Sequence, residues 1–484
     1  MSKSEPSVAR GALITVMMRW TDRLIGFVST LILARLLVPD DFGIIAMAST
    51  FIELVNVFLD LGVHISLIQN KDPSQDHYDT AWTLRLIQTS LATLIIFLTA
   101  PLAALYFKDP RVAPVLRVLS FSFIFGGLEN IGVVTFQKEM KFGLDFRFVF
   151  LKRICGFTAT MVAAFVLRSY WALVIGTISG RVSGVALSYF SHSMRPSFSF
   201  VKFREIFSVS QWVMVRSVSG FLENSLHKLV VGRRESSAIM GAYALADEIS
   251  AMPSTELLAP LNRVLFPAFV RVKGDLDELK RIFLLSQGLQ ILLCLPACVG
   301  LGLLANEVVR IMLGDKWLIA ISFIQILAFV HMFSAVTSSS EYVLMTLGRI
   351  RILAIFSWIQ VSLFALGAFA LIPNGGAITI AWMRLIVAVG GVVFIPWFII
   401  RALPGLRVWD MFKNLIRPLI AVSAMALCLR GLGPLDIMPI VFIALIKIVA
   451  GAISYTVVVL MLWQLAGRPY GAETYLLEKF GLKL

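Results

Sequence analysis

Two apolar runs at the start of the chain each carry a stripe of charged side chains. The stripes consist of Arg19, Asp22 and Arg23 in residues 12–37 and of Glu53 and Asp60 in residues 42–68. Spacings of three, four and seven residues place each set on one face of a helix. An ionised group at the centre of a bilayer costs roughly 2.5–3.5 kcal/mol on insertion scales. Both stripes must therefore face a protein interior or a water-filled cavity rather than lipid.

Composition assigns the chain to a single class. Of its 484 residues, 58% are hydrophobic and 15% are charged, whereas a soluble protein carries about 25% charged residues. Mean hydropathy is +0.86. The net charge of +14 lies mostly in short loops between apolar runs, where membrane topology explains it better than nucleic-acid binding does. The chain is a polytopic membrane protein.

Apolar runs of spanning length recur about 14 times, which predicts an all-α fold. The predicted spans are 12–37, 42–68, 83–107, 115–136, 149–168, 171–191, 207–231, 240–266, 282–305, 317–340, 353–372, 376–400, 416–433 and 439–465. A faint repeat relates the opening hairpin to the segment near residue 240. We therefore expect a six-helix lobe over 1–200, a second over 201–400, and two further helices with a tail over 401–484, with a site where the repeated bundles meet.

Basic residues predict the orientation. With the N-terminus inside, about 24 Lys and Arg fall in inside loops and the tails against about 8 in outside loops. Both termini are therefore expected to be cytoplasmic. Trp82, Trp171, Trp317 and Trp409 lie near span ends, as expected for interface anchors.

Carboxylates inside the spans are candidates for gating or ion coupling, because a buried carboxyl can exchange a proton in the physiological range. They are Asp22, Glu53, Asp60, Glu129, Glu223, Asp247, Glu248 and Glu341. The alternative is that each neutralises a nearby arginine. His64 and His331 are further candidates for titration near neutral pH.

Several short motifs resemble one family. Residues 33–43 read Leu-Ala-Arg-Leu-Leu-Val-Pro-Asp-Asp-Phe-Gly, residues 60–63 Asp-Leu-Gly-Val, 67–69 Leu-Ile-Gln and 314–317 Gly-Asp-Lys-Trp. This pattern is similar to that of the Wzx-like bacterial polysaccharide flippases, within the multidrug/oligosaccharidyl-lipid/polysaccharide (MOP) exporter superfamily. The exopolysaccharide branch is favoured over the O-antigen branch. Length and span count agree along the whole chain, and the residue signature is dense only over about 30–90.

The resemblance implies two lobes around a central cavity, with the last two helices outside them. It also implies transport of undecaprenyl-diphosphate-linked oligosaccharides across the bacterial inner membrane, beside a polysaccharide polymerase and export machinery. Arginine's planar fork suits the phosphate oxygens of such a substrate. The substrate-binding candidates are Arg19, Arg23, Arg181, Arg216, Arg384 and Lys228. A structural ion-pair network is the alternative for Arg19 and Arg23, and snorkelling to the interface is the alternative for Lys228.

Two other functions compete with this interpretation. A multidrug or organic-cation antiporter of the same superfamily needs an acidic and aromatic cavity, which the arginines within spans disfavour. A membrane polymerase or ligase of lipid-linked sugars needs a large catalytic outside loop, and the predicted outside loops are short. We expect a transporter that is not an enzyme. No Gly-x-x-x-x-Gly-Lys-Ser/Thr run is present, and the four cysteines form no metal motif, so no cofactor or metal is expected.

Overall fold

The structure is a computed structural model that describes residues 5–59, 67, 73–432 and 438–479. Within these ranges the side chains of 5–16, 204–217, 259–260 and 263–264 are not described. Every element of secondary structure in the described residues is a helix, as the composition predicts. It packs as two compact units, Met1–Gly241 and Ala242–Leu484. The predicted division into lobes of 1–200 and 201–400 with a third segment stays a prediction.

Fourteen long helices occur in the described residues. They are α1 (Glu5–Leu36), α2 (Pro39–Leu59), α4 (Gln75–Phe107), α5 (Val112–Leu128), α7 (Phe142–Leu167), α8 (Trp171–Ser191), α9 (Phe203–Arg234), α10 (Ser237–Arg271), α11 (Leu276–Leu303), α13 (Ala320–Thr346), α14 (Ile350–Ala365), α15 (Ala377–Ala402), α16 (Val408–Gly431) and α17 (Ile440–Leu465). Shorter elements are η1 (Ile131–Val133), α6 (Val134–Lys138), α12 (Ala305–Met312), η2 (Asp315–Trp317), η3 (Leu366–Leu371) and α18 (Ala472–Lys479).

Ten helices in the described residues are long and apolar enough to cross a membrane, and α5 with α6 adds an eleventh if the bent pair is one span. These lengths confirm a polytopic all-α membrane protein. Helices α1, α9 and α10 are not among the ten. They are long but polar, and α1 carries the first charged stripe identified in the sequence.

The turn between the first two spans is shorter than predicted. The predicted spans 12–37 and 42–68 leave residues 38–41 for the turn, but α1 ends at Leu36 and α2 already begins at Pro39. Proline suits the first helical position because its fixed φ matches the helix and its missing N–H needs no partner there. Asp40 and Asp41 follow in the first turn, where negative charge complements the helix dipole. The family-like motif is therefore a helix start.

The span predicted over 115–136 corresponds to a bent pair of helices. Helix α5 ends at Leu128, and the chain bends by 67° into η1 and α6. Asn130 stabilises the bend: its Oδ1 accepts the Gly132 N–H at 2.9 Å, and its own N–H donates to Ser188 Oγ at 2.9 Å. Glu129 therefore sits at the corner.

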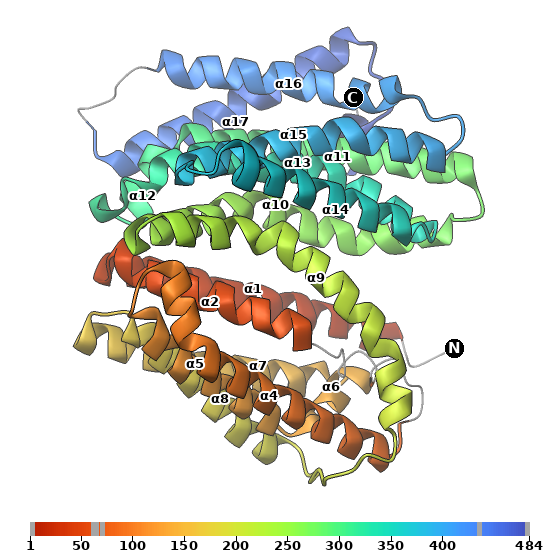
Figure 1. Ribbon diagram of the computed structural model, residues 1–484. Helices are drawn as coiled ribbons and strands as arrows, with labels where there is room; N and C mark the ends of the chain where they lie inside the picture. The colour runs from red at the N-terminus through yellow and green to blue at the C-terminus, as the bar shows by residue number, and fades with distance from the viewer. Residues whose placement is uncertain (1–4, 60–66, 68–72, 433–437, 480–484) are drawn as a thin grey trace. The chain divides into compact units, whose positions relative to one another are not determined.

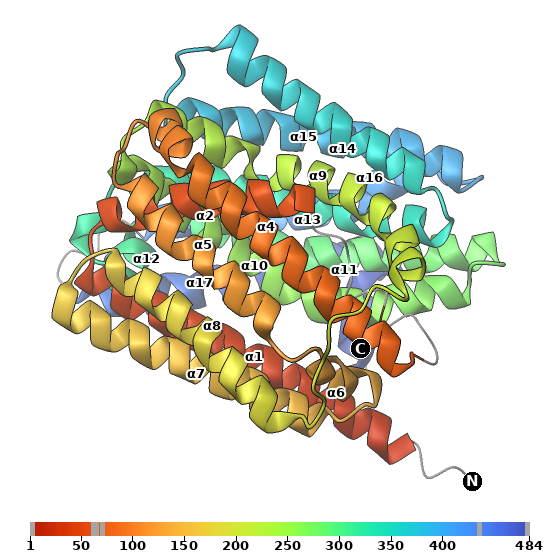
Figure 2. The same cartoon turned by 60° about the horizontal axis from the view of Figure 1, so that its bottom comes forward.

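Within the first unit, α4, α5, α7 and α8 run side by side, and α1 packs on α7 (Figures 1 and 2). Within the second unit, α11 packs against α13 and α16, and α16 pairs with α17 (Figure 1). Trp82 and Trp317 were expected at the membrane interface, and this is wrong: they are 7% and 0% exposed. Trp317 follows the Gly314 turn into η2 and fills the core of the second unit.

Candidate functional site

The stripe on α1 is exposed in the protein alone. Arg19, Asp22 and Arg23 all lie on the surface, and Arg23 takes part in a polar interaction of its own. Asp22 Oδ1 lies 3.2 Å from Arg153 Nε on α7. Gly26, one turn along, leaves room for that guanidinium, because a Cβ there would lie 2.8 Å from Arg153 Nη2. The arginines of the stripe are therefore not sealed into the core.

The second stripe is described in part. Glu53 on α2 is exposed and accepts a hydrogen bond from Ser225 Oγ of α9 at 3.1 Å. On α9, Glu223 is exposed and Lys228 is half-buried, and both interact with other groups. Asp60 and His64 lie outside the described residues, and Arg216 lies in α9 among the side chains that are not described.

A buried carboxylate gathers three cations in the first unit. We call Arg85, Glu129, Lys152 and Arg181 the Glu129 cluster. Glu129 is 5% exposed. Arg85 Nη2 of α4 lies 3.3 Å from its Oε2, and Lys152 Nζ of α7 pairs with its Oε1. Arg181 of α8 is close enough to repel the charges of Arg85 and Lys152. Three positive groups surround a single negative one.

The second unit holds a buried carboxylate of its own. In the Asp247 cluster, Asp247 Oδ1 accepts hydrogen bonds from Arg384 Nη1 at 2.7 Å and from His331 Nε2 at 3.0 Å. The side chains of Asp247 and Arg384 are 10% and 13% exposed, and fully buried Tyr243 interacts with Arg384. The cluster joins α10, α13 and α15. Arg384 therefore contacts a carboxylate inside the protein. Glu248 is exposed, and Glu341 is half-buried and interacts with another group.

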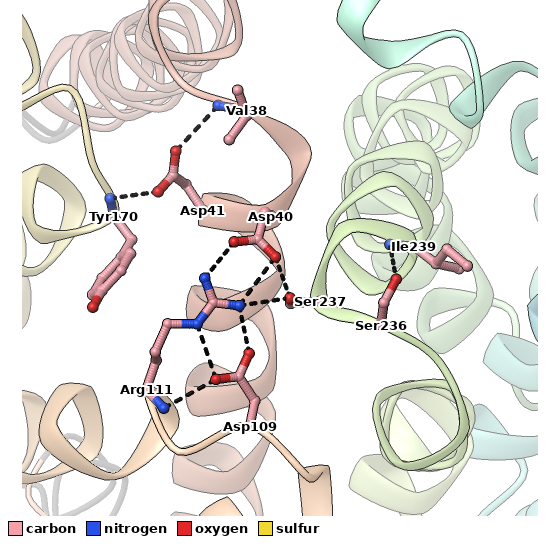
Figure 3. Close-up of polar contacts among 9 residues, drawn as sticks. All are labelled: Val38, Asp40, Asp41, Asp109, Arg111, Tyr170, Ser236, Ser237 and Ile239. Atoms are coloured by element: carbon pink, nitrogen blue, oxygen red, sulfur yellow. Dashed lines mark hydrogen bonds and ion pairs between the residues drawn. The ribbon is translucent and has the colours of Figure 1, made fainter.

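A third cluster lies where α2 begins, and we call it the Arg111 cluster: Asp40, Asp109, Arg111 and Ser237 (Figure 3). Arg111 Nη1 lies 2.5 Å from Asp40 Oδ2, and Arg111 Nη2 lies 2.7 Å from Asp109 Oδ2. Ser237 Oγ accepts from Arg111 Nη2 at 3.0 Å and itself donates to Asp40. One guanidinium thus joins the α4–α5 loop, the start of α2 and the first turn of α10.

Asp41 contacts different partners from its neighbour Asp40 (Figure 3). Its Oδ1 accepts the Tyr170 N–H at 3.0 Å, just before α8, and its Oδ2 accepts the Val38 N–H at 3.2 Å. The second bond caps α2 from within its own first turn. The two consecutive aspartates therefore fix the helix start to two separate loops.

Glycines allow α2 and α10 to approach backbone to backbone here. A Cβ at Gly43 would lie 1.7 Å from the Ser237 carbonyl oxygen, and a Cβ at Gly241 would lie 1.9 Å from the Pro39 carbonyl oxygen. Small residues permit such approach between membrane helices. Only glycine fits at either position without moving a helix.

The Arg111 cluster predicts acid sensitivity. Burial raises the pKa of Asp109, but the hydrogen bonds and charge of Arg111 outweigh it, so the pKa lies below its usual value. The hydrogen bonds that Arg111 donates to Asp109 and Asp40 raise the pKa of Arg111. A carboxyl with a lowered folded pKa stabilises the fold above its unfolded pKa, about 3.9, and this stability is lost as pH falls through the folded value.

We therefore expect Asp109→Asn to lower the Tm of the purified protein at pH 7. The difference from wild type should shrink as the pH falls below about 4, because protonated Asp109 and asparagine then interact similarly with Arg111. Thermal unfolding scans across this range in detergent measure it. A Tm difference that stays constant down to acid would contradict the charge-based role.

Sequence reasoning missed several of these residues. Arg85 and Lys152 were not proposed for a site, and Arg111 was counted only as a loop charge. For Arg85 the signal was available: it is an ionised residue inside an apolar run, which by itself marks a functional candidate. Lys152 carried the same signal, because it lies in the predicted span 149–168, but its partner Glu129 is 23 residues away and could not be named. Arg111 lies in a loop, and its contact with Asp40, 71 residues away, left no local signal.

The fold of the chain resembles that of solved structures. The chain has the fold of a lipid II flippase MurJ in its inward closed conformation, with a TM-score of 0.76 over 94% of this chain and 99% of that chain at 14% identity. The chain is thus a multi-pass membrane protein that shares the fold of that structure.

A family model described as polysaccharide biosynthesis protein matches residues 32–322, and the chain belongs to that family. It is 25% identical to the lipopolysaccharide biosynthesis protein WzxC of Escherichia coli (strain K12), over 84% of this chain and 85% of that one. It is 24% identical to the succinoglycan biosynthesis transport protein ExoT of Rhizobium meliloti (strain 1021), over 84% of this chain and 82% of that one. The resemblance seen in the sequence is confirmed.

Proposed function

We propose that this protein is a flippase that moves undecaprenyl-diphosphate-linked oligosaccharide repeat units across the bacterial inner membrane for polysaccharide synthesis. Family membership and the names of its relatives support a lipid-linked sugar as the cargo. Both termini would be cytoplasmic, and a polymerase and export machinery would act on the cargo after it crosses.

The exposed arginines on α1 carry this proposal. Arg19 and Arg23 are on the protein surface, yet they lie within a predicted span. A guanidinium facing lipid tails is costly, so the surface that carries them must meet water or a polar ligand. Arginine binds phosphate oxygens through two parallel N–H donors. A diphosphate headgroup is the ligand that such a surface, in this family, fits best.

The mechanism follows from the charges. Arg19 and Arg23 would bind the diphosphate while the prenyl tail stays in the bilayer, and alternating access would present the sugar to the opposite side. Lys228, Arg181, Arg216 and Arg384 remain candidates for substrate contact along the path. For Arg384 the contact requires that Asp247 release it. The carboxylates Asp22, Glu53, Asp60, Glu129, Glu223, Asp247, Glu248 and Glu341 remain candidates for gating or ion coupling.

We expect Arg19→Ala/Arg23→Ala to reduce polymer export by at least about tenfold in a strain that lacks the wild-type gene. Each hydrogen bond between charged groups is worth about 1.5–3 kcal/mol, and about 1.4 kcal/mol is a factor of ten. The measurement is exported polymer, normalised to the protein amount in the membrane. Arg147→Ala/Arg351→Ala is the matched control, because it removes two exposed arginines from α7 and α14.

The same strain separates a flippase from a polymerase. A flippase defect leaves single lipid-linked repeat units on the cytoplasmic side, where an impermeant lectin added outside cannot bind them. A polymerase defect leaves the units accessible to that lectin. Normal export by the Arg19/Arg23 variant at normal protein amount, or lectin-accessible accumulation, would contradict the proposal.

A further inference from the structure

The Glu129 cluster carries more positive charge than its carboxylate can neutralise. Glu129 pairs with Arg85 and Lys152, and Arg181 adds a third cation from α8. With one carboxylate and three cations, the cluster has two uncompensated positive charges among helices α4, α5, α7 and α8. Among the residues that the structure describes, Arg181 has no hydrogen-bond or ion-pair partner. A network built only for stability needs no third cation, since like charges at close range destabilise one another.

The geometry leaves these groups room. Gly184 of α8 faces the carboxylate, and a Cβ there would lie 2.6 Å from Glu129 Oε1 and 2.8 Å from Lys152 Cε. Gly126 of α5 lies beside Arg181, since a Cβ there would be 3.6 Å from Arg181 Nη1. Arg181 is itself exposed, and the side chains of Arg85 and Lys152 are 27% and 24% exposed. Glycines therefore lie next to the cluster, and a ligand could reach the three cations from outside the bundle.

The bend after α5 fixes the carboxylate. The Asn130 N–H donates to Ser188 Oγ, and its side-chain amide donates to the Met194 carbonyl at 2.7 Å. These bonds tie the corner that bears Glu129 to α8 and the segment after it. Glu129 is thus an anion held in place by the backbone, and it neutralises one of the three positive charges of the cluster. An external anion would compete with Glu129 for Arg85 and Lys152 and would neutralise the remaining positive charges.

We propose that Arg85, Lys152 and Arg181 form a binding site for a phosphate oxyanion, with Glu129 as its built-in competitor. Two guanidinium forks and one ammonium match the oxygens of a phosphate or diphosphate group, and two uncompensated charges match a doubly charged ligand. The site is distinct from the α1 stripe, and it requires no sugar transport. The phosphate is either a free anion or the headgroup of a lipid.

Two variants have opposite expected effects. Arg181→Gln removes one cation, and the ion pairs of Glu129 with Arg85 and Lys152 stay intact. We expect this variant to bind pyrophosphate about tenfold more weakly, or weaker still. Glu129→Gln removes the competitor, and we expect it to tighten binding by a similar factor. Arg181→Lys keeps the charge and should restore most of the affinity. Arg147→Gln replaces an exposed arginine five residues before Lys152 on α7 and should leave binding unchanged.

The experiment measures the Tm of the full chain in detergent as sodium pyrophosphate rises at constant ionic strength, with sodium acetate as the balancing salt. A ligand that binds the folded state raises the Tm in proportion to its saturation. A second arm compares nanodiscs of phosphatidylcholine alone with nanodiscs containing phosphatidic acid. Stabilisation in the first arm identifies a free anion, and stabilisation only in the second identifies a lipid phosphate.

Either arm supports the site if Arg181→Gln and Glu129→Gln shift affinity in opposite directions. The proposal is overturned if neither probe stabilises the wild type, or if both variants bind as the wild type does. It is also overturned if Glu129→Gln weakens binding while folding normally without the anion, because Glu129 would then be part of the ligand contact rather than its competitor. The Tm of each variant without ligand reports folding separately.

Discussion

The variant Arg384→Met is expected to lower the free energy of unfolding by about 3–5 kcal/mol. The substitution leaves Asp247, which is 7% exposed, without its guanidinium partner. Its carboxylate keeps the contact with His331 but loses the charge that neutralised it. Removing one member of a buried ion pair strands a charge in a poorly hydrated place, which costs more than the pair contributes. Thermal unfolding in detergent measures the loss.

A double variant makes this prediction specific. Asp247→Leu/Arg384→Met removes both charges, and we expect it to recover most of the stability lost in Arg384→Met, because apolar residues of similar size can replace a buried ion pair at little cost. Arg351→Met, at an exposed position on α14, should leave the Tm nearly unchanged. If the double variant is as unstable as the sum of the two single variants, the two residues are not coupled.

Export by the double variant tests the role of the pair in transport. If Arg384 contacts the substrate when Asp247 releases it, the double variant folds but exports less polymer. If the pair only stabilises the second unit, export by the folded double variant equals that of wild type. The comparison therefore separates a stabilising role from a transport role at the same residues.

The second large effect is expected from Gly43→Ala. Its Cβ would lie 1.7 Å from the Ser237 carbonyl oxygen, which is part of the backbone and cannot rotate away. The starts of α2 and α10 must therefore separate, and Arg111 must follow Asp40 or lose it. Overpacking costs about 1–3 kcal/mol, and the disturbed hydrogen bonds of the Arg111 cluster add to that. We expect a lower Tm and reduced polymer export.

Gly220→Ala is the matched control on α9. Nothing lies within 4 Å of a Cβ at that position, and alanine favours a helix over glycine by about 0.5–1 kcal/mol. This variant should be as stable as wild type or slightly more stable. If Gly43→Ala were equally harmless, α2 and α10 would not approach as closely as the structure places them, and the role given to the glycine would be wrong.

The Arg111 cluster gives a physical reason for the family-like motif around Asp40. Proline starts α2, Asp40 binds Arg111 and Ser237, Asp41 binds the Tyr170 and Val38 amides, and Gly43 admits the backbone of α10. Each residue type in this short stretch answers a separate requirement of one helix start. The motif therefore specifies the contacts that position the start of α2. These contacts could not be read from the sequence motif alone.

The sequence by itself determined the class, the helices and the family. Apolar runs of about 20 residues leave a chain few options other than membrane helices, so the all-α fold and most spans follow from composition and periodicity. Charged residues within those runs marked Arg19, Arg23, Glu129, Asp247 and Arg384 as unusual. Helical periodicity could place such residues on a face, but it could not name their partners.

Only the tertiary structure decided which charges meet. Glu129 and Arg85 are 44 residues apart, Asp40 and Arg111 are 71 apart, and Asp247 and Arg384 are 137 apart. Each pair joins separate elements of the chain, and the approach of those elements depends on the summed packing of many apolar side chains. A local pattern fixes the direction of a side chain along its own helix, whereas an ion pair depends on where a second helix lies.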